Sequence, residues 1–151
     1  MLTIPRIRKI VLQNEHVEMM LEEVKKEYPK EACGVILGQL RAGIARVQEL
    51  VFTKNIADES SVRFVMDPEE QYKILVHAEE ENKKLVGIFH SHPTAAKPSG
   101  IDKPFMEINP VVWVIVGTLG DRTDIAAYQW FMNTINPVEI AVKNLKGSKK
   151  K

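Results

Sequence analysis

Short apolar runs, each bounded by turn-forming or charged residues, constrain the fold of this chain more than any other feature of its sequence. Runs of this length that are rich in β-branched residues are typical of buried β-strands. The spacing predicts strands at Ile4–Gln13, Ala32–Gly38, Ala45–Thr53, Arg63–Met66, Leu85–Ser91, Val111–Gly117 and Ile125–Phe131, and a last, edge strand at Pro137–Val142. The chain therefore has to build a largely buried sheet.

Two segments between these strands are predicted to be helices. Asn14 is predicted to cap the first, which runs to about Tyr28 and stops at Pro29. Its apolar residues at helical spacing, which we expect to face the core, are Val17, Met20, Leu21 and Val24. The second helix begins at Asp67, which Pro68 and two glutamates follow, and runs to about Lys83. Strands and helices that alternate without a repeat predict an α/β (α+β) domain with a mixed sheet.

The composition agrees with one globular domain, which we assign to residues 1–143, followed by a disordered basic tail over residues 144–151. A net charge of +1 creates no field that would attract nucleic acid or an anionic membrane. The N-terminal segment lacks the hydrophobic region of a signal peptide, and a single cysteine cannot form an internal disulfide. We therefore expect a cytoplasmic protein; the sequence indicates no oligomeric state.

Two histidines stand at the end of the predicted strand that begins at Leu85. Because side chains alternate along a strand, His90 and His92 project to one side and Ser91 to the other. Two imidazoles in this arrangement can bind a metal. Taken alone, however, such a pair is more often a surface feature or a satisfied part of the structure.

Ser99 and Asp102 stand three residues apart, which places them on the same side of a helical turn. One interpretation is a capping pattern at a short turn, since Pro104 argues against a long helix here. The other is that Asp102 completes a His, His, Asp ligand set. Three protein ligands with a fourth position open are typical of catalytic zinc, whereas structural zinc sites are closed and usually rich in cysteine.

Glu31 lies just before a predicted strand, in the segment PKEACGVILG, and alone it is an ordinary carboxylate at a strand entrance. Together with the segment His90-Ser91-His92-Pro93 and with Ser99-x-x-Asp102, it resembles the JAMM motif of the MPN-domain metalloproteases. The likeness covers nearly the whole chain. One departure is that the loop from His92 to Ser99 is one residue shorter than is usual in that family.

The resemblance implies a single MPN/JAMM-like domain with a curved mixed sheet and cytidine-deaminase-like architecture. It also implies that His90, His92 and Asp102 bind one Zn²⁺ per chain, with water at the open position. Glu31 would be the general base, and Ser99 would donate a hydrogen bond to the developing oxyanion. Ser91, which faces away, would orient the backbone.

The activity that the resemblance implies is hydrolysis of the isopeptide bond between the C-terminal glycine of a ubiquitin-like small modifier protein and a lysine amine. The modifier's tail would lie extended along a sheet edge, and the segments Asn55–Arg63 and Thr94–Lys97 are candidate walls of its groove. Two alternatives remain. One is a peptidase that trims the C-terminus of a ubiquitin-like sulfur carrier, and the other is a non-catalytic interaction module stabilised by zinc.

Outside this motif only Cys33, His16 and His77 offer thiol or imidazole ligands, which is why a single zinc is predicted. His16 and His77 lie on the predicted helices, where we expect them to face solvent or act as caps. Cys33 is expected to be a small buried residue in a strand. A cysteine nucleophile would need a partner base, and the two histidines of the motif are better used by a metal.

Overall fold

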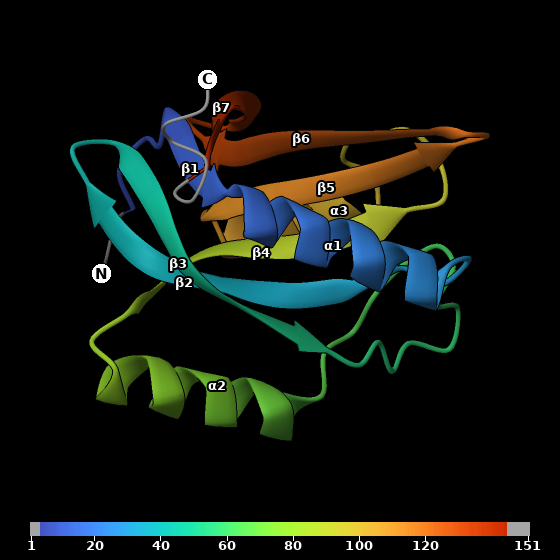
Figure 1. The fold of residues 1–151 in the computed structure, drawn as a ribbon, viewed down its shortest axis with the longest axis horizontal. Helices are drawn as coiled ribbons and strands as arrows, with labels where there is room; N and C mark the ends of the chain where they lie inside the picture. Colours follow the sequence, from blue (N-terminus) through green and yellow to red (C-terminus); the bar gives the residue numbers. More distant parts are fainter. Residues whose placement is uncertain (1–3, 145–151) are drawn as a thin grey trace.

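The structure, a computed structural model, describes residues 4–144, and within them the strands form one mixed sheet that closes on itself (Figure 1). The strand order around the closed sheet is β1-β3-β2-β4-β5-β6-β7. The elements are β1 (Lys9–Gln13), α1 (Asn14–Glu27), β2 (Cys33–Arg41), β3 (Ile44–Thr53), α2 (Pro68–Glu80), β4 (Lys84–His92), α3 (Asp102–Ile108), β5 (Val112–Leu119), β6 (Arg122–Phe131) and β7 (Thr134–Lys143). A mixed sheet with helices on it is thus confirmed, whereas the cytidine-deaminase-like architecture stays a prediction.

The closure of the sheet overturns one prediction, that residues 137–142 form an edge strand. β7 pairs with β6 on one side and, in parallel, with β1 on the other, where Lys9 lies opposite Glu139 and Gln13 opposite Lys143. An edge strand would expose a row of unpaired backbone groups, which this pairing removes. The partners of the β1–β7 pair are more than 120 residues apart in the chain, so no local pattern in the sequence indicated the contact.

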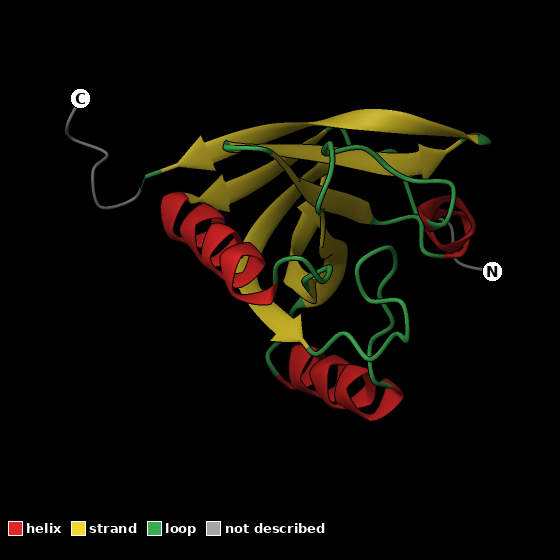
Figure 2. Cartoon of the chain, turned by 90° about the vertical axis from the view of Figure 1, so that its right-hand side faces the viewer, coloured by secondary structure: helices red, strands yellow, loops and turns green. Residues whose placement is uncertain are grey.

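Helices cover both faces of the curved sheet, as Figures 1 and 2 show. Met20 and Val24 of α1 belong to the main core cluster, which confirms the inward face predicted for that helix. The opposite face of the sheet packs against α2, and the third cluster contains Met106 of α3. Successive residues of β2 divide between these layers: Ile36 lies in the cluster with α1, and Leu37 lies in the cluster with α2.

Local details of the two predicted helices differ in part from expectation. The first is capped at Gln13 rather than at Asn14, and the backbone N–H of Gln13 donates to Nδ1 of His16 at 3.1 Å. His16 is therefore cap-like, as expected, although it is buried rather than facing solvent. The second helix begins as predicted, because the side chain of Asp67 accepts a hydrogen bond from the backbone N–H of Glu69.

One predicted strand is shorter than expected, and another is absent. The first strand starts at Lys9 rather than at Ile4. Residues 63–66 form no strand, and their only sheet-like contact among the described residues is an isolated bridge between Asn55 and Met66. The loop that runs from residue 54 to residue 67 therefore contains no helix or strand, but the bridge between Asn55 and Met66 joins its two ends.

No helix within residues 4–144 is long and apolar enough to cross a membrane. Of the segment 144–151 that is predicted to be a disordered tail, all but Asn144 lies outside the described residues.

Candidate metal centre

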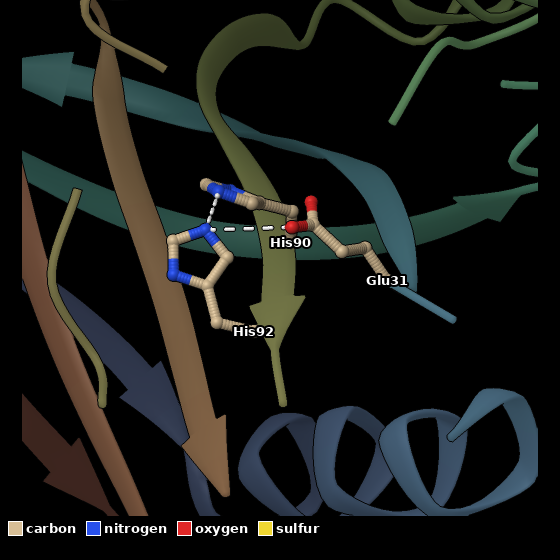
Figure 3. A group of neighbouring side chains, drawn as sticks. All are labelled: Glu31, His90 and His92. Carbon is tan, nitrogen blue, oxygen red and sulfur yellow. Dashed lines mark hydrogen bonds and ion pairs between the residues drawn. The ribbon is translucent and has the colours of Figure 1, made fainter. Parts of the chain in front are cut away.

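The end of β4 carries two histidines whose rings meet. Nε2 of His90 lies 3.0 Å from Nε2 of His92, and both residues are buried (Figure 3). β4 lies between β2 and β5, to both of which it is hydrogen-bonded. The alternation of side chains therefore places both imidazoles on one side of a strand that is fixed along its length.

Ser91 lies between the two histidines and faces the other way, as the sequence predicts. Its Oγ accepts a hydrogen bond from the backbone N–H of Ala32 at 2.8 Å, and its own backbone N–H donates to the carbonyl of Ala32 at 3.0 Å. These two bonds fix the beginning of β2 to the end of β4. They hold Glu31, the residue before Ala32, close to the histidines.

Asp102 reaches the same point from the start of α3. Its Oδ2 lies 3.1 Å from Nε2 of His90 and 3.1 Å from Nε2 of His92. The same oxygen accepts a hydrogen bond from the backbone N–H of Ser99, while Oγ of Ser99 accepts one from the backbone N–H of Asp102. The capping interpretation of Ser-x-x-Asp is therefore met, and the same carboxylate lies against both imidazoles; its role as a metal ligand stays a prediction. The shorter loop after His92 does not prevent this approach.

α3 is the short helical element expected at this point, and Pro104 lies within it. Pro104 is the third residue of the helix, which begins at Asp102 and has seven residues. The first backbone N–H groups of a helix have no intrahelical partner, so a proline there removes no hydrogen bond.

Glu31 approaches the pair of histidines from the strand beside them. Cys33 is paired with His90, so continuing this antiparallel register by two residues places Glu31 opposite His92. Oε2 of Glu31 lies 3.7 Å from Nε2 of His92, and the side chain is buried (Figure 3). Its other oxygen, Oε1, is buried without a hydrogen-bond partner among the described residues.

Burial controls the protonation of Glu31. It raises the pKa of this carboxyl to about 7; the nearby His92 lowers the pKa and the charge of Asp102 raises it further. A carboxyl group with such a pKa can accept a proton near neutral pH and give it up again.

The two imidazoles and Asp102 differ in protonation. Burial lowers the pKa of His90, which favours the neutral ring that binds metals. Burial also lowers the pKa of His92, but the hydrogen bond and charge of Asp102 outweigh it and raise that pKa overall. For Asp102, burial raises the pKa, yet the hydrogen bonds with His90 and His92 dominate and hold the carboxyl well below its usual range. Asp102 is thus a carboxylate aimed at two rings.

Two aromatic side chains, which the sequence pattern did not indicate, pack on His90. The ring of Phe64 lies 4.8 Å from the imidazole centroid, and that of Trp113 lies 5.6 Å from it in an edge-on arrangement. Nδ1 of His90 is buried and has no hydrogen-bond partner among the described residues. Packing therefore orients His90, whereas the ring of His92 forms a hydrogen bond with the backbone of Ala95.

The spacing of these ligand atoms fits a small tetrahedral ion. Zn–N distances of about 2.0–2.1 Å put the ligand atoms of a tetrahedral zinc about 3.3 Å apart. The three atoms contributed by His90, His92 and Asp102 are 3.0 to 3.1 Å apart. Glu31, His90 and His92 form a second, looser group, with ligand atoms within 4.8 Å of one another, that could also hold a metal.

Comparison of this sequence with known protein families identifies the class of protein that has this fold and this cluster. Residues 13–131 match the family described as prokaryotic homologs of the JAB domain. The chain therefore belongs to that family, and it is a peptidase of the JAMM class.

Individual relatives carry more specific names. The desampylase of Pyrococcus furiosus is 35% identical over 89% of this chain and 91% of its own length. The desampylase of Haloferax volcanii is 31% identical over 76% of this chain and 80% of its own length. The CysO-cysteine peptidase of Mycobacterium tuberculosis is 30% identical over 72% of this chain and 73% of its own length.

A solved structure has the same fold. The solution structure of the protein DSY2949 from Desulfitobacterium hafniense superimposes with a TM-score of 0.80 at 27% sequence identity. The superposition covers 89% of this chain and 93% of that one.

Proposed function

We propose that this protein is a zinc-dependent isopeptidase that cleaves the bond between the C-terminal glycine of a ubiquitin-like modifier and a lysine amine. The observation that carries the proposal is the convergence of His90, His92 and Asp102, with contacts of 3.0 to 3.1 Å, beside the buried carboxyl of Glu31. The likeness of the chain to two proteins named desampylases supports this substrate class.

His90, His92 and Asp102 would hold one zinc ion, because their ligand atoms are closer together than any set that includes Glu31. A zinc ion bound there supplies a Lewis acid that polarises a carbonyl group and makes water more acidic. Two neutral imidazoles and one carboxylate leave the site with a net positive charge, which favours both effects.

Glu31 acts as the general base in this proposal. Its carboxyl lies next to the ligand cluster without being its closest member, and its Oε1 has no partner among the described residues. Glu31 accepts a proton from the attacking water and delivers it to the lysine amine that leaves. The raised pKa of this carboxyl suits both steps.

Ser99 completes the set as a donor. Its Oγ already accepts a hydrogen bond from the backbone of Asp102, so its hydroxyl proton is available for the substrate. It donates to the carbonyl oxygen of the scissile bond as negative charge develops there. Removing one such donor costs about 2.7–4 kcal/mol of transition-state stabilisation.

A cavity of about 340 Å³ next to Asp102 is the proposed entry for the modifier's tail. Its walls come from residues 63–66, from α3 and from β5, and they include Phe64, Phe105 and Trp113. The expected wall at Asn55–Arg63 thus contributes at its C-terminal end, while Thr94–Lys97 does not line this cavity.

The alternative reaction, trimming the C-terminus of a sulfur-carrier protein, uses the same site with a different leaving group. It is favoured by the likeness to the CysO-cysteine peptidase. The location in the cytoplasm and the count of one zinc per chain stay predictions.

One experiment separates these functions. The zinc-loaded protein is incubated with a Gly-Gly-ended ubiquitin-like protein joined by an isopeptide bond to a lysine peptide, and with the same protein carrying a C-terminal extension. We expect the isopeptide conjugate to be cut faster, and Glu31→Gln to slow its cutting by about 10²- to 10⁴-fold. Glu80→Gln, an exposed site on α2, is the matched control and should behave like the native protein.

Preferential cutting of the extension would support the trimming reaction instead. If neither substrate is cut by the zinc-loaded native protein, the non-catalytic interaction module becomes the better description.

A further inference from the structure

Asn55 lies directly opposite the proposed base, although the two residues are far apart in the sequence. β2 and β3 are antiparallel, and Cys33 is paired with Thr53 at their ends. Continuing that register by two residues places Asn55 opposite Glu31. Asn55 also forms the bridge to Met66 that closes the base of the loop between them.

The side-chain amide of Asn55 is completely used in hydrogen bonds. Its Nδ2 group faces three backbone carbonyls and its Oδ1 faces two backbone N–H groups, so the orientation of the amide is unambiguous. The acceptors are the carbonyls of Glu31 at 2.9 Å, Arg63 at 3.0 Å and Ser60 at 3.3 Å, and the donors are the N–H groups of Ala57 at 3.0 Å and Val65 at 3.1 Å.

The same loop holds both backbone polar groups of Glu31. The N–H of Glu31 donates to the carbonyl of Ser60 at 2.6 Å, and its carbonyl accepts from Nδ2 of Asn55. Glu31 precedes the first residue of β2, so the ladder of the sheet does not fix its backbone. The place of its carboxyl therefore depends on this loop as well as on the bonds between Ala32 and Ser91, and Asn55 is the side chain that makes most hydrogen bonds within the loop.

The far end of this loop builds the wall of the cavity beside Asp102. Arg63, Phe64 and Met66 line that cavity, and Phe64 also packs on His90. Asn55 thus joins the loop to the backbone of Glu31 at one end, and at the other end to Arg63, beside the surface where substrate would enter.

We infer that Asn55 is a positioning residue that holds Glu31 at the metal site through its amide N–H groups and couples that position to the groove wall at residues 63–66. The inference rests on the proposed role of Glu31 as the base. It does not depend on which modifier is the substrate.

Asn55→Asp is the sharpest test, because aspartate has the same shape and keeps the acceptor for Ala57 and Val65. It loses the amide donors and sets a carboxylate against three carbonyls. Asn136→Asp is the matched control. Nδ2 of Asn136 donates to the carbonyls of Phe131 and Thr134 near the β6–β7 turn, so the control loses the same kind of bond elsewhere.

The first measurement needs no substrate. Hydrogen exchange is followed by mass spectrometry in the peptide that contains residues 29–33, in the native protein and in both variants. We expect faster exchange of this peptide in Asn55→Asp and unchanged exchange in Asn136→Asp. Equal exchange in all three proteins would show that Asn55 does not hold Glu31 in place, and would overturn the inference.

The second measurement is kinetic, on the isopeptide-linked lysine peptide, with the zinc content of each protein determined in parallel. We expect kcat to fall by about 10- to 100-fold in Asn55→Asp with one zinc retained, since small displacements of a catalytic group have effects of this size. Asn136→Asp should keep the native kcat. A higher KM with an unchanged kcat would assign Asn55 to the groove alone and overturn the inference.

Asn55→Ala, which adds no charge, is the second variant if Asn55→Asp does not fold. If both Asn55 variants fail to fold while Asn136→Asp folds, the residue is structural only and the inference is wrong. Failure of the native protein to cut the conjugate would count against the proposed function alone, because the exchange experiment still decides whether Asn55 holds Glu31.

Discussion

Two carboxylates, those of Asp102 and Glu31, lie beside the paired histidines, and substituting each in turn should show which one binds the metal and which one is the base. Oδ2 of Asp102 touches both rings at 3.1 Å, whereas the contact of Glu31 is with His92 alone, at 3.7 Å. We therefore expect Asp102→Asn to lose zinc, since a neutral amide is a poor ligand. Glu31→Gln should keep one zinc per chain and lose about 10²- to 10⁴-fold in kcat, the usual range for a general base.

Metal analysis after dialysis against a weak chelator, combined with a cleavage assay, tests this assignment. The opposite pattern, with zinc lost in Glu31→Gln and retained in Asp102→Asn, would make Glu31 the third ligand and remove it as the base.

Cys33 is two residues from Glu31, yet its surroundings make it inert. Burial raises the pKa of the thiol to about 11, and a hydrogen bond to Thr53 only partly opposes this. We expect no labelling by a thiol reagent near neutral pH until the protein unfolds. Cys33→Ala should retain full cleavage activity and lose about 1 kcal/mol of stability, as is typical of a small change in a core.

The same shift predicts how stability depends on pH. The thiol ionises more easily in the unfolded chain, near its ordinary pKa of 9.0, than in the folded protein. The buried neutral thiol therefore makes its full contribution to the free energy of unfolding below pH 9.0, and this contribution is lost as the pH rises toward 11. Denaturant titrations of native protein and Cys33→Ala across this window check the sign. A loss of activity in Cys33→Ala, or rapid labelling of the folded protein, would reopen cysteine chemistry.

Sequence reasoning succeeded for residues whose geometry is local. The shared side of His90 and His92 follows from the period of a strand, and the reciprocal bonds of Ser99 and Asp102 follow from a spacing of three. The packing of Phe64 and Trp113 on His90 had no such signal. Those rings come from a loop and from another strand, and nothing in their spacing relates them to the site.

Among the elements, those with complete local signals were predicted best. α2 has its cap, its proline and its first-turn acids in consecutive residues, and it begins where they indicate. At α3 the sequence predicts a short helical turn, and Pro104 argues only against a long helix; the helix has seven residues, and a proline in its first turn costs no hydrogen bond. Residues 64–66 are apolar like a strand, but their side chains line a cavity, and Phe64 packs on His90.

The end of β5 is packed so closely on the loop after β4 that a methyl group does not fit there. A Cβ built on Gly117 would lie 2.5 Å from the carbonyl oxygen of Thr94 and equally close to the backbone of Ala95. Because the ring of His92 forms a hydrogen bond with the backbone of Ala95, a displaced loop would also turn this imidazole.

We therefore expect Gly117→Ala to cost about 1–3 kcal/mol of stability, the usual cost of overpacking, and to weaken zinc binding. Gly100→Ala is the control for folding, because its added methyl would meet no atom within 4 Å. Denaturant unfolding and a zinc titration measure the two effects. Native zinc affinity in Gly117→Ala would show that the loop does not position His92.

At the scale of the molecule, the site joins segments that only the closed sheet brings together. Glu31 precedes β2, the histidines end β4, and Asp102 begins α3. The mixed sheet was predictable from apolar runs and alternating elements. Its closure through β1 and β7 was not, because pairing between distant strands depends on tertiary packing that a single sequence does not encode locally.

A metal that holds such distant segments together should stabilise the whole fold. Zinc binds the folded chain and finds no preformed site in the unfolded one, so at 100 times its Kd it adds about 2.7 kcal/mol. For a protein of this size we expect a chelator to lower the Tm by about 5–10 °C. The melting temperature of Asp102→Asn should not respond to chelator, because that variant has lost a ligand. A native protein whose Tm is the same with zinc and with chelator would show that β2, β4 and α3 are held by packing alone.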